Sequence, residues 1–152
     1  MSLRSPGVGY YPEWLGRDLL AGSLPWEQAV PASLATFLER HSLHESFWIG
    51  LYAEPERSAT LLLESAIGGR VEECPILAIR FDALERSEVK LRDRGLESAV
   101  SGPINRAADT HRTHLVGRHG GDATLVHSPG ARILCLGRDR EVLPALVPAE
   151  TV

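Results

Sequence analysis

The sequence has very little lysine and very little cysteine. Lys90 is the single lysine among 16 basic residues, so arginine supplies nearly all of the positive charge. A GC-rich, bacterial-type genome explains this bias more simply than arginine-specific chemistry does. The two cysteines, Cys74 and Cys135, are too few for a disulfide framework and lie in no CxxC motif. Both adjoin apolar segments, which predicts buried free thiols and a reducing, cytoplasmic environment.

Long apolar runs and the familiar catalytic motifs are also missing. No run approaches the roughly 20 apolar residues that a membrane helix needs, and residues 1–14 contain no signal-peptide pattern. We therefore expect a cytoplasmic protein that does not enter a membrane. The sequence has no HExxH, GxSxG, GxxxxGK(S/T) or GxGxxG motif. No cofactor is therefore expected, and we favour binding or self-assembly over catalysis.

The charge of the chain is negative in total but unevenly distributed. A net charge of −4 argues against nonspecific binding of the whole chain to nucleic acid or membranes. Residues 80–140, however, carry eleven Lys and Arg against eight Asp and Glu, whereas residues 1–79 carry five arginines against ten acids. This basic segment is where the sequence points to an anionic ligand.

Length and hydrophobic pattern predict one α+β domain. A chain of 152 residues, 43% of them hydrophobic, is typical of a single globular domain. We expect residues 1–22 to form an extended, aromatic-rich arm and residues 23–152 to form the domain. Apolar residues spaced i, i+3 and i+4 predict the main helix at about residues 31–42, with Pro31 at its start and one or two short helices elsewhere.

Alternating and continuous apolar segments predict a mostly antiparallel sheet of about five or six strands. The predicted strands cover residues 46–53, 59–66, 75–81, 87–92, 122–127 and 131–137. We expect the first two to form a hairpin. The last two are expected to form another around Ser128-Pro129-Gly130, because Pro-Gly suits a type II turn. Between these regions, a short helix is expected near residues 95–100.

The segment HRTHLVGRHGGD, residues 111–122, supplies a candidate set of metal ligands. Its members are His111, His114, His119 and Asp122. Three imidazoles and a carboxylate are sufficient in number for zinc, and a metal-assisted hydrolase is the enzymatic alternative for this chain. His111 and His114 share a face only if the segment is helical, since in a strand they point to opposite faces. The flanking threonines favour a strand or loop, and thus histidines that bind no metal.

The same segment also contains a candidate anion-binding set. Its members are Arg106, Arg112, Arg118 and His119. Arginine binds phosphate or carboxylate through two hydrogen bonds, and glycine-rich turns present backbone N–H groups to anions. A phosphate or nucleic-acid binder is therefore the second alternative. The competing interpretation is a solvated arginine face paired with nearby aspartates.

Aromatic residues gather in the first third of the chain. They are Tyr10, Tyr11, Trp14, Trp26, Trp48 and Tyr52. Such residues are typical of cores and of protein interfaces. Together with the apolar C-terminal tail, they predict a homodimer.

Overall fold

The computed structural model describes residues 4–5, 9–10, 12–40, 46–53, 58–64, 76–92, 95–104, 110–137 and 139–143. These residues form a mixed α+β fold that is mostly antiparallel sheet. In chain order the elements are β1 (Arg4–Ser5), β2 (Gly9–Tyr10), α1 (Glu13–Ala21), the 3-10 turn η1 (Trp26–Gln28), β3 (Val30–Ser33), α2 (Leu34–Arg40), β4 (Phe47–Ala53), β5 (Ala59–Glu64), β6 (Ile76–Phe81), β7 (Leu84–Val89), β8 (Leu96–Pro103), β9 (His111–Gly117), β10 (Asp122–His127) and β11 (Gly130–Leu136).

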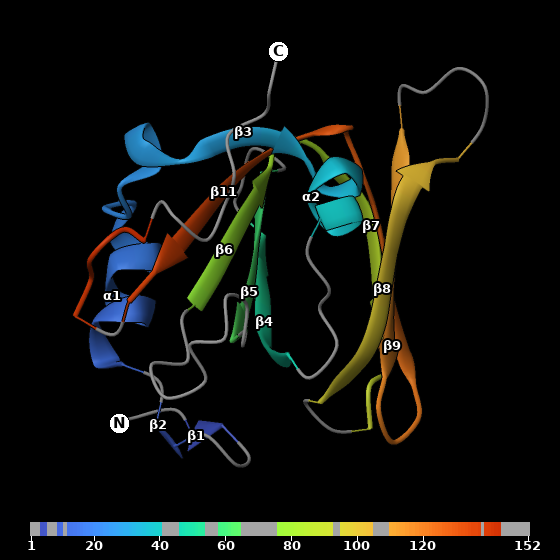
Figure 1. Ribbon diagram of the computed structural model, residues 1–152, viewed down its shortest axis with the longest axis horizontal. Helices are drawn as coiled ribbons and strands as arrows, with labels where there is room; N and C mark the ends of the chain where they lie inside the picture. Colours follow the sequence, from blue (N-terminus) through green and yellow to red (C-terminus); the bar gives the residue numbers. More distant parts are fainter. Residues whose placement is uncertain are drawn as a thin grey trace.

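The strands form two main sheets that face each other (Figure 1). One has five strands in the order β3-β11-β6-β5-β4, the other has four in the order β7-β10-β9-β8, and β1 pairs with β2. Helix α2 lies at one edge of the space between the main sheets, and α1 lies on the outer face of the five-stranded sheet. The predicted α+β class is confirmed, but the expected five or six strands are too few, since the two main sheets contain nine.

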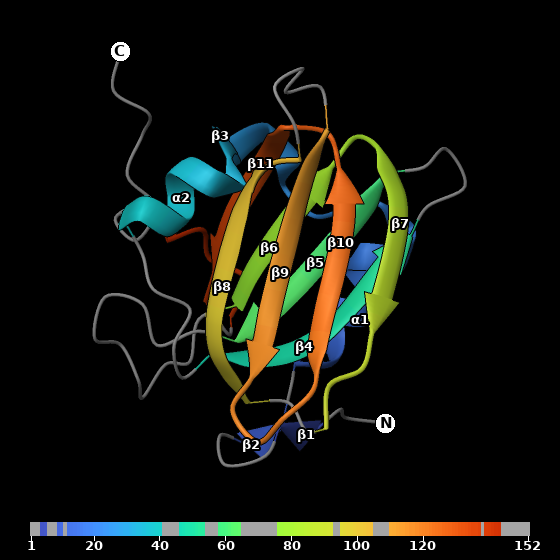
Figure 2. The same cartoon turned by 90° about the vertical axis from the view of Figure 1, so that its right-hand side faces the viewer.

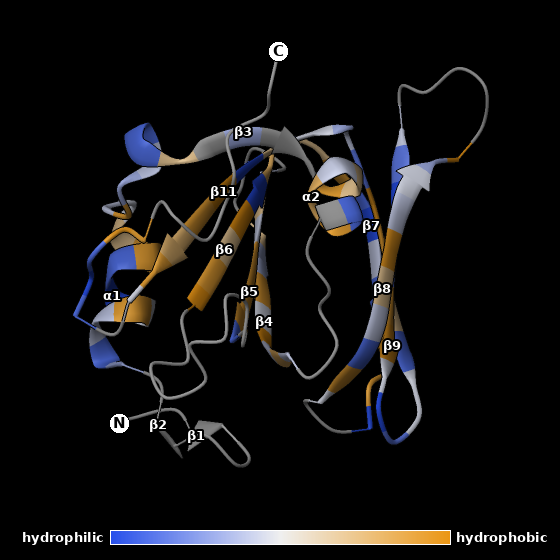
Figure 3. Cartoon of the chain, viewed as in Figure 1, coloured by the Kyte–Doolittle hydropathy of each residue, from blue (hydrophilic) through white to orange (hydrophobic). Residues whose placement is uncertain are grey.

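Burial patterns distinguish the two sheets. Every residue of β5 is buried, because the five-stranded sheet is covered on both faces. Strand β9 instead alternates between buried and more exposed residues, as expected for a sheet with one face toward solvent. Figure 2 shows that outer face across β8, β9, β10 and β7, with no described element over it. Figure 3 shows the same contrast in hydropathy, with β6 mostly hydrophobic and β9 mixed.

Two apolar clusters stabilise this arrangement. The larger fills the space between the sheets and includes Phe37 of α2, Leu63, Ile79, Leu115 and Leu125. The smaller packs α1 onto the outer face of the five-stranded sheet. Its buried members are Leu15, Leu24, Leu62, Ile76, Ala78, Leu134 and Leu136. Cys135 is buried in the larger cluster, as predicted, while Cys74 lies outside the described residues.

The main helix begins later than the sequence predicts. Residues 30–33 form strand β3, which pairs with β11, and helix α2 covers only Leu34–Arg40. Pro31 is therefore a strand residue opposite Arg132. Proline has no backbone N–H to donate. Because β3 is an edge strand, Pro31 removes no hydrogen bond from the interior of the sheet.

The short helix expected near residues 95–100 is wrong. Residues Leu96–Pro103 form β8, which pairs antiparallel with β9. Polar residues and small residues dominate this strand, so its sequence lacks the apolar alternation of a half-buried strand. Its position at the edge of the four-stranded sheet explains that composition, because four of its eight residues are exposed and only Leu96 is buried.

The hairpin expected around Ser128-Pro129-Gly130 is also wrong, although both strands exist. Strand β10 belongs to the four-stranded sheet and β11 to the five-stranded sheet, so the two do not pair. The Ser-Pro-Gly segment instead carries the chain from one sheet to the other. The other predicted hairpin is confirmed, since β4 pairs with β5.

The beginning of the chain contains a helix in the segment where the sequence predicts an extended arm. Residues Glu13–Ala21 form α1, and Gly22 ends it with a left-handed φ of 70°. Leu15 is buried against the five-stranded sheet, and Trp14 packs beside the same cluster. The helix therefore contributes to the core, and its last turn forms one side of a pocket described below.

Candidate functional site

The structure places the two central histidines on opposite faces of one strand. His111 is buried, with 9% of its surface exposed, and lies on the inner face of β9. His114 lies on the outer face, where its Nε2 is 2.9 Å from Oδ2 of Asp122. His119 is exposed in the turn between β9 and β10. Strand geometry thus separates the two imidazoles that a shared metal ion would require.

Only His114 and Asp122 of the predicted metal set are therefore brought into contact. Across the described ranges, no three His, Cys, Asp or Glu side chains are grouped in a way that could hold a metal ion. The metal-assisted hydrolase stays a prediction, with two of its four ligands adjacent.

The predicted anion-binding arginines are also spread out. Arg112 lies near the start of β9 with an exposed side chain, and Arg118 lies in the turn after it. Six residues of strand at about 3.3 Å each separate their Cα atoms by roughly 20 Å. Arg106 lies outside the described residues. A single small anion therefore cannot contact both Arg112 and Arg118.

A shallow hollow, the β8–β9 hollow, opens on the outer face of the four-stranded sheet. It has a volume of about 390 Å³ and is lined by Val100, Ser101, Gly102, Pro103, Ile104, Arg112 and His114. Val100 is 67% exposed and Ile104 is 47% exposed. The hollow thus combines exposed apolar side chains at the edge strand β8 with two basic side chains of the neighbouring strand β9.

The inner face of the same sheet contains a chain of hydrogen bonds. Oγ of Ser101 is 2.8 Å from Oγ1 of Thr113, which is 2.6 Å from Nε2 of His127. Nδ1 of His127 is 2.7 Å from the carbonyl oxygen of Ser128. Burial lowers the pKa of His127, the bond to Ser128 opposes this, and nearby His111 adds to it. The buried ring, stacked on Phe81, is therefore held in its neutral form.

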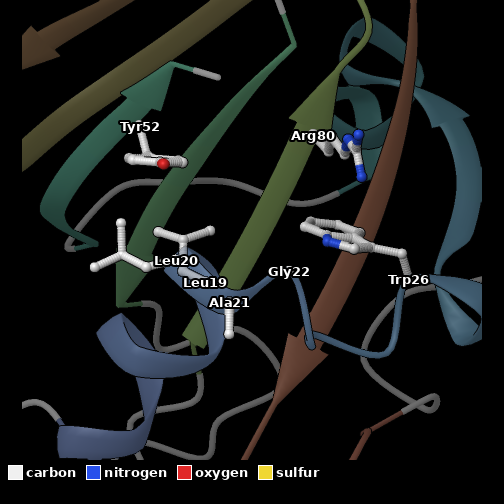
Figure 4. A pocket seen from close by; sticks show the side chains of 7 residues that line it. All are labelled: Leu19, Leu20, Ala21, Gly22, Trp26, Tyr52 and Arg80. Carbon is white, nitrogen blue, oxygen red and sulfur yellow. The ribbon is translucent and has the colours of Figure 1, made fainter. Parts of the chain in front are cut away.

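A second pocket, the helix–sheet pocket, lies where α1 meets the five-stranded sheet. It has a volume of about 240 Å³ and is lined by Leu19, Leu20, Ala21, Gly22, Trp26, Tyr52 and Arg80. These residues come from the end of α1, from η1, from β4 and from β6. Figure 4 shows Tyr52 and Trp26 on opposite sides of the view, with Arg80 beside Trp26.

The floor of the helix–sheet pocket is fixed by strand register. Tyr52 pairs with Thr60, and Thr60 pairs with Arg80, so the three side chains lie in a row on one face of the sheet. Cζ of Arg80 is 5.8 Å from the ring centre of Trp26, a cation–π distance. Thr60 is fully buried, and its Oγ1 has no hydrogen-bond partner among the described residues.

No pattern in the sequence predicts this pocket. Trp26 and Tyr52 are expected in a core or an interface, and Arg80 has no predicted role of its own. Arg80 itself is one signal in the sequence, because it is a charged residue in the apolar run of β6. Strand alternation places its side chain on the outer face of the sheet. That signal could not reveal which other segments share the face, because helix α1 was not predicted.

In the part of the chain that the structure describes, no helix has the length and apolar character required to cross a membrane. In comparisons with known proteins, no family model matches the chain, and no similar curated protein or solved structure is found.

Proposed function

We propose that the protein acts by binding a small ligand in the helix–sheet pocket. The observation that carries this proposal is the convergence of Trp26, Tyr52 and Arg80, from three separate elements, on one pocket at the end of α1. A few polar groups among apolar and aromatic walls are typical of small-molecule sites.

The chemistry of the lining supports binding over catalysis. The seven lining residues within the described ranges include a guanidinium, a phenol and an indole, but no carboxylate, imidazole, thiol or serine hydroxyl. General acid–base and nucleophilic catalysis at neutral pH draw mainly on those missing groups. The pocket is therefore suited to holding a ligand rather than to transforming it.

A blocking substitution tests this proposal. Ala21 lies on the pocket wall with an exposed side chain, so Ala21→Phe should fill the pocket without disturbing the core. Arg17→Phe, on the exposed side of the same helix, is the matched control. A library of small acids, amines and neutral compounds would be screened by ligand-observed NMR. We expect compounds that bind the native protein and the control but not Ala21→Phe. A library in which no compound distinguishes Ala21→Phe from the native protein would contradict the proposal.

Self-association through the outer face of the four-stranded sheet is a second candidate function. It is supported by the exposed side chains of Val100 and Ile104 at the β8–β9 hollow, on a strand with an unpaired edge among the described elements. A homodimer formed there should dissociate in a Val100→Asp variant, whereas Val89→Asp at the opposite edge strand should not affect it. Sedimentation velocity measures this, and a monomeric native protein at high concentration would contradict it.

A further inference from the structure

We infer that the ligand of the helix–sheet pocket is a small aromatic carboxylate, a planar organic ion with one negative charge. This inference rests on the proposed function, because it names the ligand class for the same pocket. It follows from three properties of the pocket, namely its cation, the helix end beside it and its aromatic walls.

The cation is Arg80, the only charged side chain among the lining residues that the structure describes. Its strand is hydrogen-bonded on both sides, opposite Thr60 of β5 and Arg132 of β11. A central strand holds the backbone of Arg80 rigidly at the floor of the pocket. The planar guanidinium matches the two oxygens of a carboxylate.

The end of α1 limits how much negative charge the pocket accepts. A helix C-terminus carries a partial negative charge of about half a unit, and the last turn of α1 forms one wall. The N–H groups that follow it are already used, since Gly22 donates to the carbonyl of Leu19 and Ser23 to that of Asp18. They are thus not available to an anion. A partial negative charge beside the guanidinium favours a monoanion over a dianionic phosphate.

The walls favour a flat apolar body on the ligand. Trp26 and Tyr52 lie on opposite sides of the pocket, and both remain partly exposed (Figure 4). Leu20 is 69% exposed at the rim, a large apolar surface that a ligand would cover. The volume of about 240 Å³ lies below the roughly 300–1,000 Å³ of sites for drug-sized molecules. A ligand with one ring matches these dimensions.

Phenylacetate and two comparison probes test the inference. Phenylacetamide has the same shape without the charge, and inorganic phosphate has the charge without the ring. We expect phenylacetate to bind about tenfold or more tightly than phenylacetamide, since a charge-assisted hydrogen bond is worth about one decade of affinity or more. Phosphate should not bind detectably. Isothermal titration would give the affinities, and the indole N–H resonance of Trp26 would report the location.

Variants separate the pocket from general charge effects. Arg80→Gln should weaken phenylacetate binding by about tenfold, and Arg80→Lys by less, because lysine keeps the charge but loses the paired donors. Arg132→Gln removes a neighbouring exposed arginine outside the lining and should change the affinity by less than about twofold. Near-ultraviolet circular dichroism would confirm that each variant is folded.

Each alternative outcome overturns a different statement. If phenylacetamide binds as well as phenylacetate and Ala21→Phe blocks both, the carboxylate assignment is wrong while the proposed function stands. If phosphate binds more tightly than phenylacetate and depends on Arg80, the monoanion assignment is wrong. If phenylacetate does not bind at its highest soluble concentration, the ligand class is wrong, and the wider library screen decides separately whether the pocket binds any small ligand.

Discussion

Thr113 and His127 share a buried hydrogen bond on the inner face of the four-stranded sheet, with Oγ1 of Thr113 2.6 Å from Nε2 of His127. Its direction follows from the other ring nitrogen. The carbonyl oxygen of Ser128 can only accept, so Nδ1 of His127 carries the proton and donates to it. In the neutral ring Nε2 is then an acceptor, which makes Thr113 the donor. The hydroxyl of Ser101 in turn donates to Thr113.

Acidification should therefore destabilise the protein through His127. Burial is the main cause of its lowered pKa, so the native ring resists a proton that the unfolded chain takes up below about 6.5. The contribution to stability is complete above that pH, and it is lost as the pH falls toward and through the lowered pKa. Protonation also places hydrogen on Nε2, which then cannot accept from Thr113.

The measurement is urea denaturation between pH 7.5 and 5, values chosen around the ordinary histidine pKa near 6.5. We expect the free energy of unfolding to fall with pH in the native protein and to fall less in His127→Gln, whose amide does not titrate. His111, 6.4 Å away, is retained in both proteins. His114→Gln, on the outer face, is the control and should behave like the native protein. Equal slopes for the native protein and His127→Gln would show that His127 does not carry the effect.

Removing the hydroxyl of Thr113 should destabilise the protein at neutral pH, where the ring of His127 is neutral. Thr113→Val keeps the shape of the side chain but leaves Nε2 of His127 without its donor in a buried site. We expect a loss of about 1–3 kcal/mol in the free energy of unfolding, the usual cost of an unsatisfied buried polar group. Thr113→Ser restores the donor and loses one methyl group, worth about 0.8 kcal/mol. A Val variant as stable as the native protein would show that the hydrogen bond contributes nothing.

Local sequence patterns predicted most strands but not how they combine. The apolar runs of β4, β5 and β6 stand out in the sequence, and the predicted positions of these strands are close to those in the structure. Nearly all of β5 and β6 is buried, while β4 is half-buried. Strand β8 has Glu97, Ser98 and Ser101 in place of apolar alternation, so its sequence resembles a short helix or loop. The Ser-Pro-Gly segment illustrates the same difficulty. A turn signal shows that the chain changes direction, but not whether the next strand joins the same sheet.

The candidate sites also differ in how far the sequence predicts their geometry. Strand alternation alone places His111 and His114 on opposite faces, so the local sequence could anticipate that part of the geometry. The helix–sheet pocket depends instead on a pairing register that brings Tyr52 and Arg80 beside Thr60 from three strands. Side chains from separate elements that meet through tertiary contacts leave no fixed spacing in the sequence.

The opposite placement of His111 and His114 has its own measurable consequence. His111 is buried on the inner face of β9, so His111→Ala should leave a cavity and cost about 2 kcal/mol. His114 is partly exposed and paired with Asp122, so His114→Ala should cost less than about 1 kcal/mol. Thermal and urea denaturation would measure both. Two equally small effects would contradict the inner position of His111 and revive a shared ligand role for the two imidazoles.

The turn between β9 and β10 depends on a glycine that no other residue can replace. Gly121 has a φ of 80°, and a Cβ there would overlap the carbonyl oxygen of Lys90 and lie 2.9 Å from the backbone nitrogen of Arg92. The chain after β7 packs directly against this turn, where Asp122 and Lys90 exchange backbone hydrogen bonds. Gly121→Ala must therefore strain the turn or separate these two segments. We expect it to cost about 3 kcal/mol, at the upper end of ordinary single substitutions.

Gly102→Ala is the matched control for Gly121, because it lies in β8 of the same sheet and a Cβ there meets nothing within 4 Å. It should change the free energy of unfolding by less than about 0.5 kcal/mol. Hydrogen exchange of the amides of Lys90 and Asp122 would locate the damage, since their backbone hydrogen bonds join the two segments. If Gly121→Ala were as stable as Gly102→Ala, with these amides still protected, the close approach of Lys90 to the turn would be wrong.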